Sequence, residues 1–486
     1  MGENGTENGV NGASAEKRKA EDVASNGDSG AKKEKLEGGT LLFSGATDWK
    51  LVGRKGNELV KSTNTQWSPV RLEALKDVSV VNVNRGCSSA FALVMDDGGQ
   101  VYAWGRNEDG QLGLGDTEDR MVPELVQEIT GHNIVEIATG KAHSLFLTSE
   151  GKVLAAGSND KGQCGQGKKT GNLETPKLIS HEGADIVSVA CGAEFSVLLD
   201  KDGKVWTFGM PADGMLGHND DGKFIAKANK VEYRCEYAPK QVSVWVDKDP
   251  KTKEVTPLDM PKIAKISCGP QHTVAIDDTN KVYSWGFGGY GRLGHSETGN
   301  ELVRKVVTPR GLFTIAFYCR FPDLCRVSPE RIGVWLMLCV APNLTWACVR
   351  SPRWSTCGAS TPPPRRPTCT LSLCRTSPAG TRGASLVTPR SAPASNCCDL
   401  LIMFVLQGWI VAADDAVIAA MPSPCTGELG CGDKKKSSAS PCVVETLSDA
   451  YVLKVGAGPA HSLYIVRNSS DKDKANLEKF KILDQS

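Results

Sequence analysis

The stretch "WGFGGYGRLGH", residues 285–295, contains the glycine pattern G-x-G-x-x-G, spelled by Gly286, Gly288 and Gly291. A loop that cradles a nucleotide phosphate needs a helix that opens directly after these glycines. The sequence that follows, "RLGHSE" from Arg292, has no helical period of apolar residues. The pattern therefore does not predict a nucleotide site, and the glycines need another explanation.

Similar glycine spacing occurs three times earlier in the chain. The related stretches are "WGRNEDGQLGLGD" from Trp104, "AGSNDKGQCGQGK" from Ala156 and "FGMPADGMLGHND" from Phe208. When the four stretches are aligned, Gly288 has no counterpart, so G-x-G-x-x-G is an accident of one copy. The glycines therefore belong to an internal repeat.

A second recurring stretch precedes each glycine-rich one. Its copies are "RGCSSAFALVMDDGGQVYAW", "TGKAHSLFLTSEGKVLAA", "CGAEFSVLLDKDGKVWTF" and "CGPQHTVAIDDTNKVYSW". Short apolar runs rich in β-branched and aromatic residues predict a strand, a tight turn and a second strand in each copy. We expect two-residue hairpin turns at Asp97-Gly98, Glu150-Gly151 and Asp202-Gly203.

The period of the repeat predicts an all-β fold, a seven-bladed β-propeller. The leading glycines fall at positions 86, 140, 192 and 269, roughly 50 residues apart with one longer unit. "LLFSGATDWKLVGR" near the N-terminus matches the second half of a unit, and "VGAGPAHSLYIVR" near the C-terminus matches the first half. The two halves are expected to complete one blade and so to close the ring. The four leading glycines mark four units, two more units are expected between Gly269 and Gly456, and the shared blade brings the count to seven.

These repeats resemble those of the regulator of chromosome condensation family of propellers. The resemblance is carried by "GATDWKLVGRK", "CGAEFSVLLD", "DGKFIAKANKVEYRCE" and "WGFGGYGRLGH", and it covers blades at 40–307 and 411–467. It implies a regulator of small GTPases of the Ral or Rac type, acting by guanine-nucleotide exchange or related control. Roles with centromeric chromatin, mitotic chromosomes and microtubules are also implied, with no cofactor and no small-molecule substrate. An adapter that binds such partners without promoting exchange is the alternative.

Residues 309–408 interrupt the repeat, which resumes in register at "VAADDAVIAAMPSPCTGELGCGD". They carry 11 Arg, no Lys and 3 acidic residues, with 9 of the chain's 17 Cys and 12 of its 25 Pro. We expect a frameshifted or intronic segment that corrupts one and a half blades; a genuine lineage-specific insertion is the alternative. Without His or a C-x-x-C pair, a zinc site is not expected there. The 46 basic and 53 acidic residues outside it give a net charge of −7, which argues against DNA binding through the ring.

An insertion at 219–258 lengthens the third unit. A long connection on a rigid scaffold favours partner contact, and this one places aromatic residues among Lys and Arg. The proposed contact residues are Lys223, Phe224, Tyr233 and Tyr237. In the founding member of the family, a β-wedge that protrudes from the propeller helps to release nucleotide from a small GTPase. Extra strands that cover a blade edge are the alternative interpretation.

The termini are expected to lie outside the propeller. Residues 1–39 read as a disordered tail rich in Ser, Gly, Asn and acids, and residues 468–486 as a charged C-terminal tail. Two basic clusters in the first tail have the spacing of a bipartite nuclear import signal; a solvated tail without that role is the alternative. Their residues are Lys17, Arg18, Lys19, Lys32, Lys33 and Lys35. We therefore expect the protein in the nucleus and on chromosomes, at the centromere and spindle midzone, and also in the cytoplasm.

No residue pattern predicts covalent catalysis or a metal site. Three His-Ser or His-Thr pairs recur at one repeat position, which favours structural hydrogen bonds over a nucleophile and base. The pairs are His143-Ser144, His272-Thr273 and His461-Ser462. No integral membrane segment is expected either, because the apolar run at 332–349 is broken by Pro342 and Asn343 and the run at 400–413 is too short.

Overall fold

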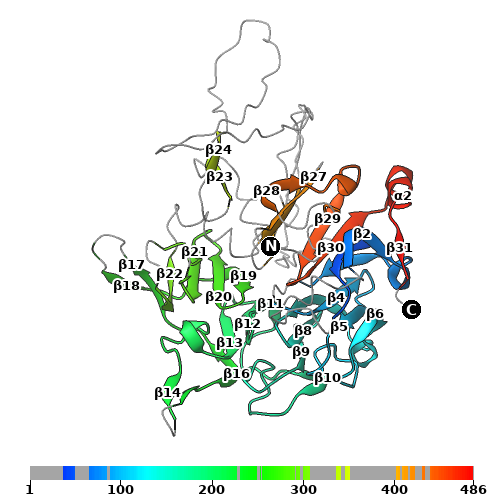
Figure 1. The fold of residues 1–486 in the computed structure, drawn as a ribbon. Helices are drawn as coiled ribbons and strands as arrows, with labels where there is room; N and C mark the ends of the chain where they lie inside the picture. Colours follow the sequence, from blue (N-terminus) through cyan, green and yellow to red (C-terminus); the bar gives the residue numbers. More distant parts are fainter. Residues whose placement is uncertain are drawn as a thin grey trace, which may run out of the picture. The chain divides into compact units, whose positions relative to one another are not determined.

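The computed structural model describes residues 37–49, 65–84, 88–226, 230–248, 252, 254–289, 292–295, 299–306, 335–340, 345–350, 401–405, 408–413, 416–421, 430–432 and 438–484. For residues 303–306, and for the strands between 335 and 443, it describes the backbone. The described residues are almost entirely β-structure, as the repeats predict (Figure 1).

The described strands form six four-stranded antiparallel units and three further hairpins. The first unit joins β29 (Val452–Ala457), β30 (His461–Arg467), β1 (Gly39–Ala46) and β2 (Thr65–Leu72). The second unit consists of β3 (Val80–Val83), β4 (Phe91–Asp96), β5 (Val101–Gly105) and β6 (Arg120–Leu125). The third consists of β7 (Ile134–Thr139), β8 (His143–Thr148), β9 (Val153–Gly157) and β10 (Leu173–Leu178). The fourth consists of β11 (Ile186–Cys191), β12 (Phe195–Asp200), β13 (Val205–Gly209) and β16 (Glu236–Gln241). The fifth and sixth are β19 (Ile263–Gly269), β20 (His272–Asp277), β21 (Val282–Gly286) and β22 (Glu301–Val306); and β25 (Leu401–Val405), β26 (Gly408–Ala413), β27 (Ala416–Met421) and β28 (Ser438–Val443).

The two ends of the chain share the first unit. β1 pairs with β30 over seven consecutive residue pairs, from Gly39 opposite Arg467 to Gly45 opposite His461. Figure 1 shows these first strands, in blue, beside the last ones, in red. All eight residues of β1 are buried, because β1 is a central strand with β30 on one side and β2 on the other. The half-repeats at the two termini predict this pairing, whereas the count of seven blades stays a prediction.

The hairpin turns differ from the expected two-residue form. Four residues separate β8 from β9, and the backbone N–H of Gly151 donates to the carbonyl of Thr148 while that of Thr148 donates to Lys152. Gly151 has a φ of 77°, which suits the left-handed residue that follows a type I turn in a longer hairpin loop. The prediction was wrong because a glycine after an acidic residue fits both turn forms.

Gly286, the first glycine of the G-x-G-x-x-G stretch, terminates β21. Its φ is 106°, and a Cβ there would lie 2.9 Å from the Cα of His272 on the neighbouring strand. The glycine therefore permits close approach of two strands, and residues 287–289 and 292–295 after it contain no α-helix. This geometry is that of a blade and not of a phosphate loop.

The stretch 309–408 is described at three strands. β23 (Trp335–Val340) and β24 (Thr345–Arg350) pair as an antiparallel hairpin, and β25 is the first strand of the sixth unit. The other residues of this stretch, apart from Gly408 in β26, lie outside the described part of the chain. Its foreign origin stays a prediction.

The C-terminal residues form a short ordered segment where the sequence suggests only a charged tail. Helix α2 (Asp471–Leu477) begins at Ser470, whose hydroxyl accepts from the N–H of Asp473 in a capping box. Leu477 and Phe480 are buried in the core of the first unit. β31 (Ile482–Leu483) then pairs in parallel with the end of β2, so the segment is docked on the outer strand of that unit.

Candidate partner-binding hairpin

The insertion at 219–258 divides into three parts. The first is a separate two-stranded hairpin of β14 (Lys223–Ile225) and β15 (Val231–Tyr233). The second is β16, which is the outer strand of the fourth unit. The third is a hairpin of β17 (Trp245–Lys248) and β18 (Val255–Leu258), which pairs with β22 of the fifth unit. The alternative of extra strands on a blade edge is therefore confirmed for β17 and β18. The β14–β15 hairpin lies outside the blade sheets, and partner contact by it stays a prediction.

The pairing of β14 with β15 sorts their side chains onto two faces. Lys223 lies opposite Tyr233 and Ile225 lies opposite Val231, so these four residues share one face. Tyr233 contacts the buried core of the neighbouring units, whereas Ile225 and Val231 are 73% and 45% exposed. An apolar strip thus runs from an anchored end of the hairpin to an exposed one.

The base of the hairpin is held by hydrogen bonds to its backbone. The side chains of Asp220 and Asp221 accept from the N–H groups of Gly222 and Lys223 at 2.9 and 3.0 Å. The carbonyl of Gly222 accepts from the N–H of Arg234 at 2.8 Å. These bonds fix the entry and the exit of the hairpin, which makes it a pre-ordered element rather than a free loop.

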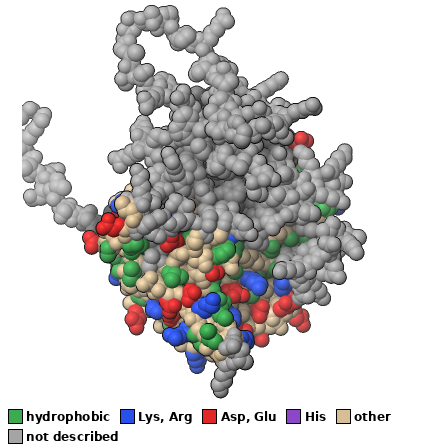
Figure 2. Space-filling model, turned by 60° about the vertical axis from the view of Figure 1, so that its left-hand side comes forward, with side chains coloured by type: hydrophobic (Ala, Val, Ile, Leu, Met, Phe, Trp, Pro, Cys, Tyr) green, Lys and Arg blue, Asp and Glu red, His purple; other side chains and the backbone are tan. Residues whose placement is uncertain are grey.

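The second face of the hairpin is aromatic and charged. The Arg234 guanidinium carbon lies 5.9 Å from the centre of the Phe224 ring, at the limit of a cation–π contact. Glu232 is exposed on this face and lies 3.9 Å from Lys230, while the exposed Lys223 lies on the first face. Exposed apolar side chains flanked by basic groups are typical of a protein interface. Figure 2 shows hydrophobic, basic and acidic side chains interspersed on the face that it presents.

Of the four residues proposed from the sequence, the structure brings three together. Lys223, Phe224 and Tyr233 lie on β14 and β15, while Tyr237 lies on the blade strand β16. The Tyr237 hydroxyl donates to the carbonyl of Asp160 at 3.3 Å, and partial burial raises the pKa of this phenol. Tyr237 therefore connects two consecutive units. Sequence reasoning missed Ile225 and Val231, although both are apolar residues in a polar stretch.

The recurring histidines are structural. His143 is fully buried, and its Nε2 lies 3.0 Å from the Ser196 hydroxyl of the next unit. The Ser144 hydroxyl donates to the carbonyl of Gln111 at 2.6 Å instead of facing His143. Burial lowers the pKa of His143 to about 3, so its imidazole is neutral near pH 7 and out of reach of a substrate. The repeated His and Ser positions fasten neighbouring units to each other.

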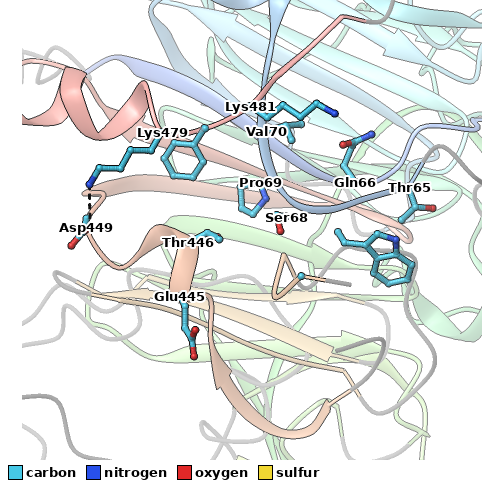
Figure 3. A pocket seen from close by; sticks show the side chains of 13 residues that line it. Thr65, Gln66, Ser68, Pro69, Val70, Glu445, Thr446, Asp449, Lys479 and Lys481 are labelled. Carbon is cyan, nitrogen blue, oxygen red and sulfur yellow. Dashed lines mark hydrogen bonds and ion pairs between the residues drawn. The ribbon is translucent and has the colours of Figure 1, made fainter. Parts of the chain in front are cut away.

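An open groove of about 660 Å³ lies beside the first unit (Figure 3). Residues 65–70 of β2 form one wall, and Glu445, Thr446 and Asp449 around the 3-10 turn η8 (Glu445–Leu447) form another. Lys479 closes one end and lies 3.4 Å from Asp449.

Within the described residues, no cluster of His, Cys, Asp and Glu could hold a metal ion, and no helix has the length and apolarity for a membrane span.

The comparisons with known proteins agree with this architecture. The sequence profile of the Regulator of chromosome condensation (RCC1) repeat matches residues 98–147, 150–199, 202–276 and 279–317. The crystal structure of Prp20p from Saccharomyces cerevisiae aligns with a TM-score of 0.55 at 15% identity, over 92% of this chain and 95% of that one. Human WBSCR16 aligns with a TM-score of 0.56 at 16% identity, over 89% and 100%. The fold thus defines a β-propeller protein built from repeats.

Two relatives match along most of their length. The protein RCC2 homolog of Danio rerio is 37% identical over 419 residues, which cover 85% of this chain and 76% of that protein. Protein RCC2 of Homo sapiens is 36% identical over 417 residues, which cover 85% and 72%. The chain belongs to the regulator of chromosome condensation (RCC1) repeat family.

Proposed function

We propose that this propeller binds and regulates small GTPases of the Ral or Rac type, and that the β14–β15 hairpin is its contact element. The observation that carries the proposal is the hairpin itself, with Ile225 and Val231 exposed beyond an anchored base. Support also comes from Prp20p, whose crystal structure was described together with its binding properties to Gsp1p, a small GTPase, and to histones.

Exchange requires differential binding and no bond chemistry. A regulator that holds the nucleotide-weak conformation of a GTPase more tightly than the nucleotide-bound one shifts the population toward release. A hairpin whose strands are already paired suits this task, because less ordering free energy is lost when it docks than for an unpaired loop. The exposed Lys223 and Arg234 supply positive charge next to the apolar strip, which would steer the hairpin to an acidic rim on the partner.

A nucleotide-release assay tests the proposal. Purified full-length chain is mixed with Ral- and Rac-type GTPases that carry fluorescent nucleotide, and release is followed by stopped flow. Accelerated release with at least one of them is expected. Binding without release would instead identify an adapter propeller, and the absence of binding to every member of the panel would contradict the proposal.

We further propose a chromosomal role, in which the N-terminal tail directs the protein to the nucleus and the propeller then acts at the centromere and spindle midzone, and on microtubules. The six basic residues of the import signal lie outside the described part of the chain, so this proposal rests on their spacing in the sequence. It is consistent with the description of Prp20p as a histone-binding propeller.

Replacing Lys17, Arg18, Lys19, Lys32, Lys33 and Lys35 by Ala is expected to leave a fluorescent fusion of the full chain largely cytoplasmic, because import receptors recognise basic clusters by charge. The measurement is the ratio of nuclear to cytoplasmic fluorescence in live cells. A control fusion changes the same number of exposed lysines on the propeller. Nuclear accumulation equal to that of the unmodified fusion would rule the signal out.

A further inference from the structure

The outer strands of the four-stranded units share a proline. In β6, β10 and β16, the proline lies three residues after the residue that pairs with the closing glycine of the neighbouring strand in the unit. In β2 and β28, the proline lies three residues after the residue that takes part in the equivalent pair. The five prolines are Pro69, Pro123, Pro176, Pro239 and Pro441. One register position of the outer strand is therefore proline in five of the six described units.

A proline at this position closes the edge of a sheet. It has no N–H to donate, so it is tolerated in an outer strand where its nitrogen faces away from the neighbouring strand. An incoming strand finds no donor there, which discourages edge-to-edge pairing between molecules. The proline thus removes the backbone donor at one register position of each of these five outer strands.

Strand β22 of the fifth unit is the exception among the described outer strands. Glu301 pairs with Gly286, so the register position three residues later is Arg304. This residue has the N–H that the other units lack. In the structure β17 lies along this edge in parallel, with Trp245 opposite Arg304 and Val246 opposite Lys305. The proline-containing strand β2 also carries an added strand, but β31 pairs with it beyond Pro69, at Arg71 and Leu72. Among the described outer strands, β22 is the one whose added strand pairs at the register position itself.

The added hairpin is anchored in the core and ends the sheet. Trp245 is 2% exposed, and its ring lies 5.1 Å from Tyr283 and 6.0 Å from Trp285 between ring centres, edge to face. On its other side β17 pairs with β18, where Val246 lies opposite Pro257. The extended six-stranded sheet therefore again ends in a strand that contains proline.

We propose that the β17–β18 hairpin is an edge cap, which occupies a strand-acceptor site on β22 that would otherwise pair with β22 of a second copy of this chain. A second copy is the fitting occupant because an edge strand is self-complementary when two copies meet antiparallel about a twofold axis. The proposal is independent of GTPase binding. It assigns to the insertion a protective role that the other described units fill with proline.

The test replaces residues 244–259 by a Gly-Ser linker of the same length in the full chain. Light scattering after size-exclusion chromatography is expected to show a rise in mass from one chain to two with increasing protein concentration. Adding Arg304→Pro to this variant is expected to restore the mass of one chain, because proline closes the edge again. A matched control, the same replacement of residues 223–233, is expected to remain a single chain. A linker variant that stays monomeric, or association that Arg304→Pro does not reduce, would overturn the proposal.

A second measurement keeps the hairpin intact, in case the linker variant does not fold. In full-length chain, Arg304→Pro is expected to make the amides of Trp245 and Val246 exchange with solvent at least about tenfold faster, because the proline removes the N–H of residue 304 and so weakens the pairing of β17 with β22. The protein should remain a single chain, since the new proline closes the edge. Unchanged protection of both amides would show that β22 is not a strand acceptor, and so would contradict the edge cap.

Discussion

A chain that begins at Thr47 is expected to lose cooperative thermal unfolding, whereas one that begins at Glu37 is expected to melt like the full-length protein. The difference between the two is β1, in which Leu41, Leu42 and Phe43 are at most 1% exposed. Burial of three such side chains is worth about 5–9 kcal/mol, which is comparable to the whole stability of a typical domain, about 5–15 kcal/mol. Without β1, the strands β30 and β2 also lose their shared neighbour.

Differential scanning calorimetry of the two truncated chains makes this comparison. A synthetic peptide of residues 37–49, added to the shorter chain, should restore part of the transition because it can re-form the pairs with β30 and β2. If the chain that begins at Thr47 melts within a few degrees of the longer one, the N-terminal strand is not a structural member of the first unit.

The free energy of unfolding is expected to fall by about 3 kcal/mol between about pH 6.5 and about pH 5, from two histidines alone. Burial lowers the pKa of His143 and of His272 to about 3 from an ordinary value near 6.5. In this window the unfolded chain binds a proton at each imidazole and the folded chain does not. The contribution of these two histidines to the free energy of unfolding is therefore fully present above about pH 6.5. It is lost as the pH falls toward 3, by about 1.4 kcal/mol per pH unit for each histidine.

Urea unfolding at several pH values measures this slope. His143→Gln removes one of the two groups, so about half of the pH dependence should disappear. His132→Gln changes an exposed histidine and serves as the matched control, in which the full slope should remain. An unfolding free energy that does not depend on pH in this window would mean that the two imidazoles are not buried as neutral groups.

Much of the fold follows from the sequence because its information is repeated. Each copy of the repeat, roughly 50 residues long, carries a recognisable pair of strands, a turn and a closing glycine, so the copies reinforce one another. The shared first unit is also predictable, since complementary half-repeats can only complete each other. The turn form is not, because Gly151 in a left-handed conformation fits several hairpin types.

The docking of the C-terminal segment depends on contacts distant in sequence. Ser470 and Asp473 have the spacing of a capping box, which predicts a helix start but not the surface on which the helix lies. That surface is fixed by Leu477 and Phe480 entering the core of the first unit and by the Arg71 guanidinium donating to the carbonyl of Phe480. Contacts between segments that are distant in the chain leave no periodic pattern in the sequence.

The candidate site was only partly predictable for a similar reason. The motif "APKQ" in β16 parallels "TPKL" in β10, and this likeness would have assigned Tyr237 to a blade. The long stretch between β13 and β16 hides it, because the outer strand is displaced from its usual spacing. The exposure of Ile225 and Val231 could not be read from the sequence, since it depends on where Tyr233 is anchored.

The affinity of hairpin variants for the nucleotide-free GTPase shows whether the β14–β15 hairpin is the contact element for a small GTPase. Ile225→Ala with Val231→Ala is compared with Met121→Ala and Leu178→Ala, two residues on outer strands that are 45% and 56% exposed. Both double variants should melt close to the unmodified chain, since exposed truncations cost little stability. The hairpin variant is expected to bind at least about tenfold more weakly, while the control variant binds like the unmodified chain. Equal affinities of the two double variants would contradict it.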